Sequence, residues 1–349
     1  MILKTFIPDL AFSSQVSNIT LAAAADVKFV LYKVSDDNTR KEILSELYTP
    51  DNDSMIYILK LHKIINGYLE EVIADDFVFS FTESEETYEV TSRIILSRSE
   101  INATAPKFTA NRFLSLLKGD KTTRPDSKEY LSVYSLSADQ VTIKAYYRDD
   151  TTETYSDETI SGPIVNANAV TLIDVSPANY ASENLVLVRY TILCGDRIMN
   201  FWIDNLSKQS PLSVLFSNNF GVVETFSVSG ALQWEPKYTN DIGTIRGEYN
   251  KYNTEYYREY TANTGVMDKL TADWIETDLF SSLLVFEIRD SYIWKKIMIS
   301  DQTVKRSSSG SETPSFEFKY RISQYIQDVI DFTDYLHRVF DITFDESFD

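Results

Sequence analysis

Residues able to carry out nucleophilic, acid–base or zinc chemistry are scarce in this sequence. Its 349 residues include two histidines, His62 and His337, and one cysteine, Cys194. A zinc site takes three or four ligands, and a catalytic nucleophile needs a base beside it. We therefore expect neither site, and we interpret Cys194, which lies in a strand-like run, as a buried structural thiol. The sequence also lacks the glycine-rich motifs that bind phosphates, so we expect no cofactor.

Oxygen ligands are plentiful, which makes calcium the best candidate metal. Three acidic clusters could supply such ligands: Asp36-Asp37-Asn38, Asp51-Asn52-Asp53 and Asp149-Asp150. None of them fits a 12-residue calcium loop with a central Gly and a terminal Glu. We interpret the three clusters as ordinary turns and expect no metal.

Carboxylates could also serve a glycoside hydrolase, which needs two of them facing each other across a cleft. Asp273, Glu276 and Asp278 are candidates among the 52 acidic residues. The sequence does not place any two carboxylates across a cleft. We rank this hypothesis last and predict that the protein is not an enzyme.

Aromatic side chains are the most abundant candidate binding groups, with 22 Tyr and 20 Phe. Exposed Trp and Tyr on a β-sheet can stack on sugar rings, and the candidates are Trp234, Tyr238, Tyr249 and Tyr252. The alternative, which we favour, is that these aromatics fill sheet cores and cross-strand pairs.

The elements that would position these groups are mostly strands, because Tyr, Phe, Ile, Val and Thr are common. At 40.0 kDa the chain exceeds the size of a single core. We predict a mainly β protein (all-β with a few short helices), built as tandem antiparallel β-sandwich-like domains plus a C-terminal helix. The expected units are residues 1–105, 106–205 and 206–325, followed by an acidic segment, residues 326–349.

Each unit combines strands with one short helix. In the first, strands at 27–34, 43–48, 77–81 and 88–96 surround a helix at 61–69. In the second, Thr109 would cap a helix with Phe113, Leu116 and Leu117 on its apolar face and Gly119 after its end. A hairpin follows, with Gly195-Asp196 as a type II′ turn.

In the third unit, the spacing of Tyr252, Tyr256 and Tyr260 fits one face of a strand or of a helix, and we favour the strand. A helix should begin near Asp268. Its inward residues would be Leu270, Trp274, Ile275 and Leu279. Alternation over 316–322 predicts an amphipathic strand with Phe316, Phe318, Tyr320 and Ile322 on its buried face.

The C-terminal segment reads as an amphipathic helix that Ser323 could cap. Its apolar face would include Ile326, Val329, Ile330, Leu336 and Phe340. Two interpretations remain open. The helix docks on a partner protein, or it packs on its own domain.

The net charge of −19 disfavours nucleic acid and anionic membrane surfaces as partners. No run approaches the 18 apolar residues of a membrane span. The first nine residues lack the apolar core of a signal peptide. We therefore expect the protein to remain in the cytoplasm until it assembles with its partners.

Several short motifs in the first and third units are similar to a known group of proteins. They include Leu44–Asp51, Phe216–Gly221, Glu224-Thr225, Gly247–Tyr249, Asn263–Gly265, Ala272–Glu276 and Leu279–Ser282. In this order they resemble uncharacterised proteins encoded in prophages and mobile elements of Bacteroides-type gut bacteria. Those proteins are encoded among tail genes and look like tail or tail-tip components.

The resemblance implies a structural component of a phage or phage-like tail, in a ring or at the tip. Its partners would be other tail proteins or further copies of itself. It implies no catalytic residues and no cofactor. The alternative, from a different class, is a carbohydrate-binding or host-adhesion protein that uses the aromatics named above.

Overall fold

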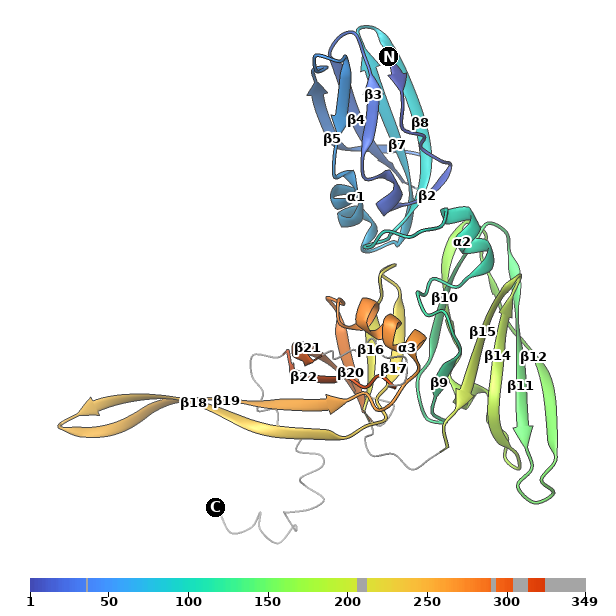
Figure 1. Cartoon of the computed structure of the whole chain (residues 1–349), viewed down its shortest axis with the longest axis vertical. Coiled ribbons are helices and arrows are strands. Elements are labelled where there is room, and N and C mark those ends of the chain that lie inside the picture. Colours follow the sequence, from blue (N-terminus) through green and yellow to red (C-terminus); the bar gives the residue numbers. More distant parts are fainter. Residues whose placement is uncertain (36, 206–211, 290–292, 304–312, 324–349) are drawn as a thin grey trace, which may run out of the picture.

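The computed structural model describes residues 1–35, 37–205, 212–289, 293–303 and 313–323. The fold is mainly β, as predicted, with five sheets and a few short helices in these ranges. Figure 1 shows the first unit at the top, the second at the right and the third at the lower centre. The predicted apolar face of the C-terminal helix, which included Ile326 and Phe340, lies outside the described residues.

The first unit is a sandwich of two sheets around one core. The five-stranded sheet has the order β2 (Leu10–Phe12), β8 (Glu86–Ile95), β7 (Ala74–Glu83), β4 (Val27–Val34) and β5 (Arg40–Tyr48). The three-stranded sheet has the order β1 (Ile2–Leu3), β3 (Ile19–Ala22) and β6 (Met55–Ile58). The predicted helix is confirmed as α1 (Leu61–Leu69), and a short turn, η1 (Ser13–Val16), lies beside it. Apolar residues in alternation drive both sheets to bury one face against the other.

The second unit also places two sheets face to face. Its larger sheet has the order β12 (Tyr155–Val165), β11 (Asp139–Arg148), β14 (Val186–Cys194), β15 (Arg197–Ile203) and β9 (Lys121–Thr123). The smaller one pairs β10 (Tyr130–Ser135) with β13 (Ala169–Asp174), which η2 (Pro177–Tyr180) follows. The hairpin turn at Gly195 is confirmed, because Gly195 has the positive φ of +59° that a type II′ turn requires.

The helix predicted from Thr109 is wrong in its position. Helix α2 covers Ala105–Asn111. Phe113 and Leu117 lie beyond it, in an irregular segment, and are buried. Pro106 fixes the backbone for the first helical turn, so the helix begins earlier. The Thr109 hydroxyl donates to the carbonyl of Ala105 from inside the helix instead of capping it.

The third unit is one seven-stranded sheet. Its order is β17 (Val223–Ser227), β16 (Ser213–Ser217), β20 (Val285–Arg289), β21 (Ile293–Thr303), β22 (Glu317–Ile322), β19 (Glu248–Asn263) and β18 (Leu232–Ile245). The predicted amphipathic strand is confirmed, with Phe316, Phe318 and Tyr320 buried. The strand interpretation of residues 249–260 is confirmed as well.

A helical segment begins where the sequence predicted it. Asp268 accepts hydrogen bonds from the N–H groups of Leu270 and Thr271, and α3 (Lys269–Trp274) continues into a π-helical turn, η3 (Ile275–Leu279). Trp274, Ile275 and Leu279 are buried. The prediction for Leu270 is wrong, because its side chain is 42% exposed and lies on the surface against Gly119.

The apolar cores are not confined to single units. One continuous cluster joins the second and third units, from Phe113 to Tyr320. A smaller cluster, containing Phe12, Phe108 and Phe220, joins all three units where they meet. The three units therefore pack against one another through this cluster.

Candidate functional site

A long two-stranded arm leaves the body of the third unit, and it is the most distinctive surface of the protein (Figure 1). Strands β18 and β19 pair along their whole length, from Leu232 opposite Ala262 to Ile245 opposite Glu248. Arg246 and Gly247 close the hairpin, with φ values of +55° and +84°. Two positive φ values in a two-residue loop are typical of a type I′ turn, whose twist matches that of the strands.

All four aromatic residues predicted as candidates lie on this arm and are exposed. The exposed fractions are 58% for Trp234, 61% for Tyr238, 85% for Tyr249 and 70% for Tyr252. The preferred interpretation, that these aromatics fill sheet cores and cross-strand pairs, is wrong as to a core, although Tyr238 does form a cross-strand pair with Tyr256. Beyond its base the arm is a two-stranded ribbon, and no second sheet among the described residues packs on it, so these residues enclose neither of its faces in a core.

Trp234 and Tyr238 belong to a continuous row on one face of the arm. Across the strand pair, Trp234 lies opposite Tyr260 and Tyr238 lies opposite Tyr256. The Tyr238 and Tyr256 rings are 5.0 Å apart between centroids. The guanidinium carbon of Arg258 lies 5.1 Å from the centre of the Trp234 ring. We call these residues, Trp234, Tyr238, Tyr256 and Arg258, the aromatic face.

The aromatic face begins at the buried core. Tyr260 stacks on Tyr320 of β22 with centroids 5.0 Å apart, and both rings are buried. Farther out, the Arg258 Nε donates to the Tyr256 hydroxyl over 2.8 Å, which raises the pKa of Arg258. These contacts fix the side chains before any partner arrives, so binding would order few of them.

Tyr249 and Tyr252 lie nearer the tip and are not part of this row. Tyr249 pairs with Thr244 next to the turn. A bulge between Asp241 and Ile242 leaves Tyr252 without a paired residue. The Tyr252 ring lies against Gly243, where an added Cβ would be 3.4 Å from it.

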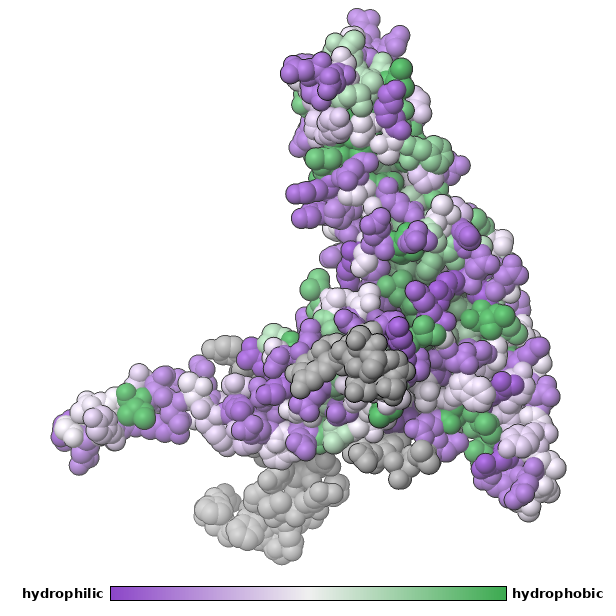
Figure 2. Space-filling model, viewed as in Figure 1, coloured by the Kyte–Doolittle hydropathy of each residue, from purple (hydrophilic) through white to green (hydrophobic). Residues whose placement is uncertain are grey.

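Tyr256 and Arg258 belong to the site but were not predicted from the sequence. The available signal was the alternation of Trp234, Pro236 and Tyr238 ahead of Arg246-Gly247, a pattern typical of a hairpin strand. The aromatic face does not stand out when residues are coloured by hydropathy, because Trp and Tyr have intermediate hydropathy values. In Figure 2 the arm is mainly purple and white, with one green patch near its outer end.

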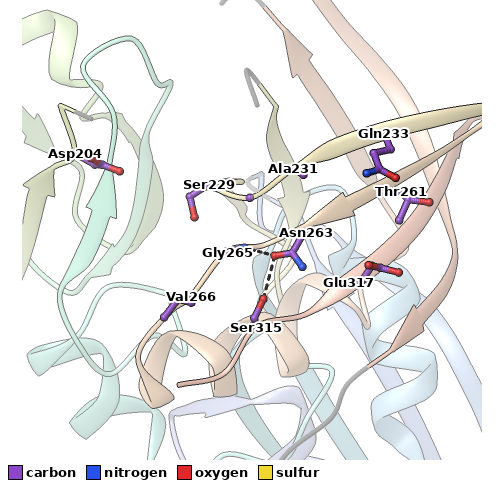
Figure 3. Close-up of a pocket in the computed structure, with 11 residues that line it drawn as sticks. Asp204, Ser229, Ala231, Gln233, Thr261, Asn263, Gly265, Val266, Ser315 and Glu317 are labelled. Atoms are coloured by element: carbon purple, nitrogen blue, oxygen red, sulfur yellow. Dashed lines mark hydrogen bonds between the residues drawn. The ribbon is translucent and has the colours of Figure 1, made fainter. Parts of the chain in front are cut away.

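A polar hollow of about 650 Å³ lies at the base of the arm (Figure 3). Its lining includes Gln233, Thr261, Asn263 and Glu317. Gln233 pairs with Thr261, on the opposite side of the ribbon from Trp234 and Tyr260. The Asn263 side-chain oxygen accepts hydrogen bonds from the Gly265 N–H (2.8 Å) and the Ser315 hydroxyl (3.0 Å). The hollow offers hydrogen-bonding groups but no stacked ring.

Buried ionisable groups lie between the second and third units, and the sequence analysis did not predict them as a group. Lys121 donates to Glu129 over 2.6 Å, and Thr123 and Thr225 donate to the same carboxylate. Nearby, Glu224 and Asp278 are both buried, and burial raises the pKa of each. Asp278, one of the carboxylates considered for glycoside hydrolysis, is completely shielded from solvent in this structure.

In the acidic clusters considered for calcium, Asp37, Asp51 and Asp149 accept hydrogen bonds from within their own turns, and Asp36 lies outside the described residues. Asp51 accepts hydrogen bonds from the N–H groups of Asp53 and Met55, and Asp149 accepts from Thr151 and Thr152. A hydrogen bond from the Thr39 hydroxyl lowers the pKa of Asp37, and one from the Thr151 N–H lowers the pKa of Asp149. Within the described ranges, no group of three His, Cys, Asp or Glu side chains could hold a metal ion.

The single cysteine and one histidine have structural surroundings. Cys194 is buried, and burial raises the pKa of its thiol. His62 shares a hydrogen bond of 2.7 Å with the Ser17 hydroxyl through Nδ1. His337 lies outside the described residues. Among the helices that the structure describes, none has the length and apolar character to cross a membrane.

Comparison with other proteins adds no assignment. No protein-family profile matches this sequence. No curated protein matches it either.

Proposed function

We propose that this protein is a non-enzymatic structural component of a phage or phage-like tail, in a ring or at the tip, that assembles through protein–protein contacts. The observation that carries the proposal is the arm with its exposed aromatic face. An isolated two-stranded hairpin is marginally stable in water, and contiguous exposed apolar surface marks interaction sites. A partner that covers the arm would supply the packing that it lacks.

The length of the arm suits contact at a distance from the body. Strand β18 has 14 residues, which corresponds to roughly 45 Å at about 3.3 Å per residue. An arm of this reach can cross onto a neighbouring subunit. The resemblance to tail proteins points to the same kind of role, with other tail proteins or further copies of this chain as partners.

The composition of the aromatic face favours a protein as its partner. Trp, Tyr and Arg are the residue types that most often dominate the binding energy of protein interfaces. Here Trp234, Tyr238, Tyr256 and Arg258 lie together and are held by contacts within the arm. Pre-ordered anchors of this kind lose little side-chain entropy on binding.

The backbone edge of the arm is less suited to binding than its face. Strand β18 is the end strand of the seven-stranded sheet. It contains Pro236, which has no N–H to donate, and proline is typical of edge strands that resist pairing. We infer that the side chains of the aromatic face, rather than added strands, make the contact.

A carbohydrate-binding or host-adhesion role is the second candidate. The exposure of Trp234, Tyr238, Tyr249 and Tyr252 favours it, because sugar rings stack on exposed aromatic faces. The polar hollow at the base of the arm could supply hydrogen bonds to hydroxyl groups. The same aromatic residues therefore have to be tested against both kinds of partner.

The test is reconstitution of the full chain, alone and with the products of its neighbouring genes, followed by size-exclusion chromatography with light scattering. We expect assemblies of defined mass. The double variant Trp234→Ala/Tyr238→Ala should weaken them at least about tenfold, because truncating an interface anchor often costs more than about 1 kcal/mol. The matched control is Thr239→Ala/Glu255→Ala, a cross-strand pair on the opposite face, which should leave assembly unchanged.

A wild-type chain that stays monomeric and binds none of these proteins would contradict the proposal. A glycan array separates the second candidate from the first. Glycan binding that the aromatic double variant abolishes, with no assembly in the wild type, would assign the arm to carbohydrate instead.

A further inference from the structure

The loop between β16 and β17, residues 218–222, touches all three units, and we call it the joint loop. The Asn219 carbonyl accepts the N–H of Arg98 from the first unit (3.0 Å). The Asn218 side-chain amide donates to the Leu114 carbonyl of the second unit (2.7 Å). Phe220 packs against Phe12 and Phe108 at centroid distances of 5.6 Å and 5.3 Å. The loop therefore connects the unit that bears the arm to the other two.

One buried carboxyl group, Asp278, links the joint loop to the second unit. Its Oδ1 accepts the N–H of Asn219 at 3.1 Å, and its carboxyl also accepts the backbone N–H of Leu116. Its Oδ2 has no hydrogen-bond partner among the residues that the structure describes. The residue is fully buried, so an ionised Asp278 would hold an incompletely solvated charge.

A second buried carboxyl group lies beside it. Glu224, on β17, accepts hydrogen bonds from Asn218 Nδ2 (2.8 Å) and Trp274 Nε1 (3.2 Å) through Oε2. Burial and then the negative charge of Glu224 raise the pKa of Asp278 to about 8. Two neighbouring buried carboxyl groups cannot both ionise without a large cost.

The other charged groups around this pair offer only partial compensation. Lys121 on β9 attracts Glu224, but its ammonium group already bonds to Glu129, just before β10, at 2.6 Å. Arg98 approaches from the first unit and donates to the Asn218 carbonyl at 3.2 Å rather than to a carboxylate. Ionisation of both carboxyl groups would thus leave negative charge at the junction that its neighbours compensate only in part.

We propose that the joint loop is a pH-sensitive joint, which holds the three units together while Asp278 carries its proton and loosens when that proton is lost to solvent. In the neutral acid, Oδ1 is a carbonyl oxygen that accepts the Asn219 N–H without a net charge. Ionisation places a second negative charge beside Glu224. Moving the joint loop away admits water to that charge, and the same movement releases the contacts of Asn219 with Ser97 and Arg98. This inference does not depend on what the arm binds.

Hydrogen exchange of the full chain, corrected for the intrinsic effect of pH, tests the proposal. Between about pH 6 and about pH 9.5, we expect protection of residues 96–98, 114–117 and 218–222 to fall about tenfold or more. Protection of the first-unit core strand, residues 77–81, should not change. Small-angle scattering should show a larger radius of gyration at the higher pH.

Isosteric variants give the decisive comparison. Asp278→Asn and Glu224→Gln should each weaken the response, and the double variant should abolish it. The matched control is Asp273→Asn on α3, an exposed position, which should respond like the wild type. The proposal is overturned if the wild type shows no loss, if the double variant loses protection equally, or if residues 77–81 lose protection together with the joint.

Discussion

Gly221, at the end of the joint loop, allows the first unit to pack closely against the third. Its φ is +76°, a conformation that residues with a Cβ adopt at a cost. An added Cβ would lie 2.6 Å from Leu96 Cδ2 and 2.9 Å from Ile73 Cδ1, both in the first unit. Leu96 is fully buried and Ile73 is half-buried, so the Leu96 side chain in particular has little room to move. Gly221→Ala should therefore damage this junction directly.

Two costs add in this variant. The left-handed backbone costs an alanine about 1–2 kcal/mol. Forcing a methyl group into a packed contact costs roughly a further 1–3 kcal/mol. We expect the free energy of unfolding to fall by roughly 2–5 kcal/mol, measured by urea unfolding followed by circular dichroism.

Gly195→Ala is the matched control, because it has the cost of the left-handed backbone without the cost of the close contact. Gly195 has a φ of +59°, and an added Cβ would meet its nearest neighbours at 3.5 Å and 3.7 Å, which are ordinary contacts. Its expected loss is about 1–2 kcal/mol. If the two variants lose stability equally, within about 0.5 kcal/mol, the close packing inferred at Gly221 is refuted.

Three further predictions concern the buried and capping groups. Lys121→Met should cost about 3–5 kcal/mol in urea unfolding, because it leaves the buried Glu129 charge uncompensated, and adding Glu129→Gln should recover much of that loss. Asp268→Ala should cost about 0.5–2 kcal/mol by removing the cap of α3, while Asp268→Ser should retain most of the stability. Between its unfolded pKa of 3.8 and its folded pKa of about 8, Asp278 binds more protons in the folded state, so stability should fall as pH rises through this window and level off above it. The fall can reach about 6 kcal/mol, and urea titrations across this range should show it reduced in Asp278→Asn; an unchanged pH dependence would contradict the assignment.

Strong local patterns predicted the elements they encode. The helix at 61–69, the Gly195 turn, the start of a helix near Asp268 and the strand at 317–322 all follow from periodicity or from residue-specific backbone preferences. The helix near Thr109 was misplaced, because Pro106 and the Thr109 hydroxyl compete with the pattern that Phe113, Leu116 and Leu117 suggest. Apolar spacing alone did not distinguish a helix face from an irregular buried segment.

Only part of the candidate site was predicted from the sequence. Trp234, Tyr238, Tyr249 and Tyr252 were identified by residue type, which does not reveal whether an aromatic is buried or exposed. Tyr256 and Arg258 join the face only because the register of the hairpin places them across from, or diagonal to, Tyr238 and Trp234. The joint was not predicted, since Asn219, Leu116 and Asp278 are far apart in the chain.

The sequence by itself determined the β-rich class, the positions of several strands and helices and the scarcity of residues for catalysis, because composition and short-range periodicity act locally. The tertiary structure decided that strands β18 and β19 extend beyond the sheet as an arm, and that two carboxyl groups meet where three units join. The physical reason is that a strand's periodicity specifies which side chains share a face, but not what covers that face. Burial, and with it the ionisation of Asp278, depends on residues brought together only by folding.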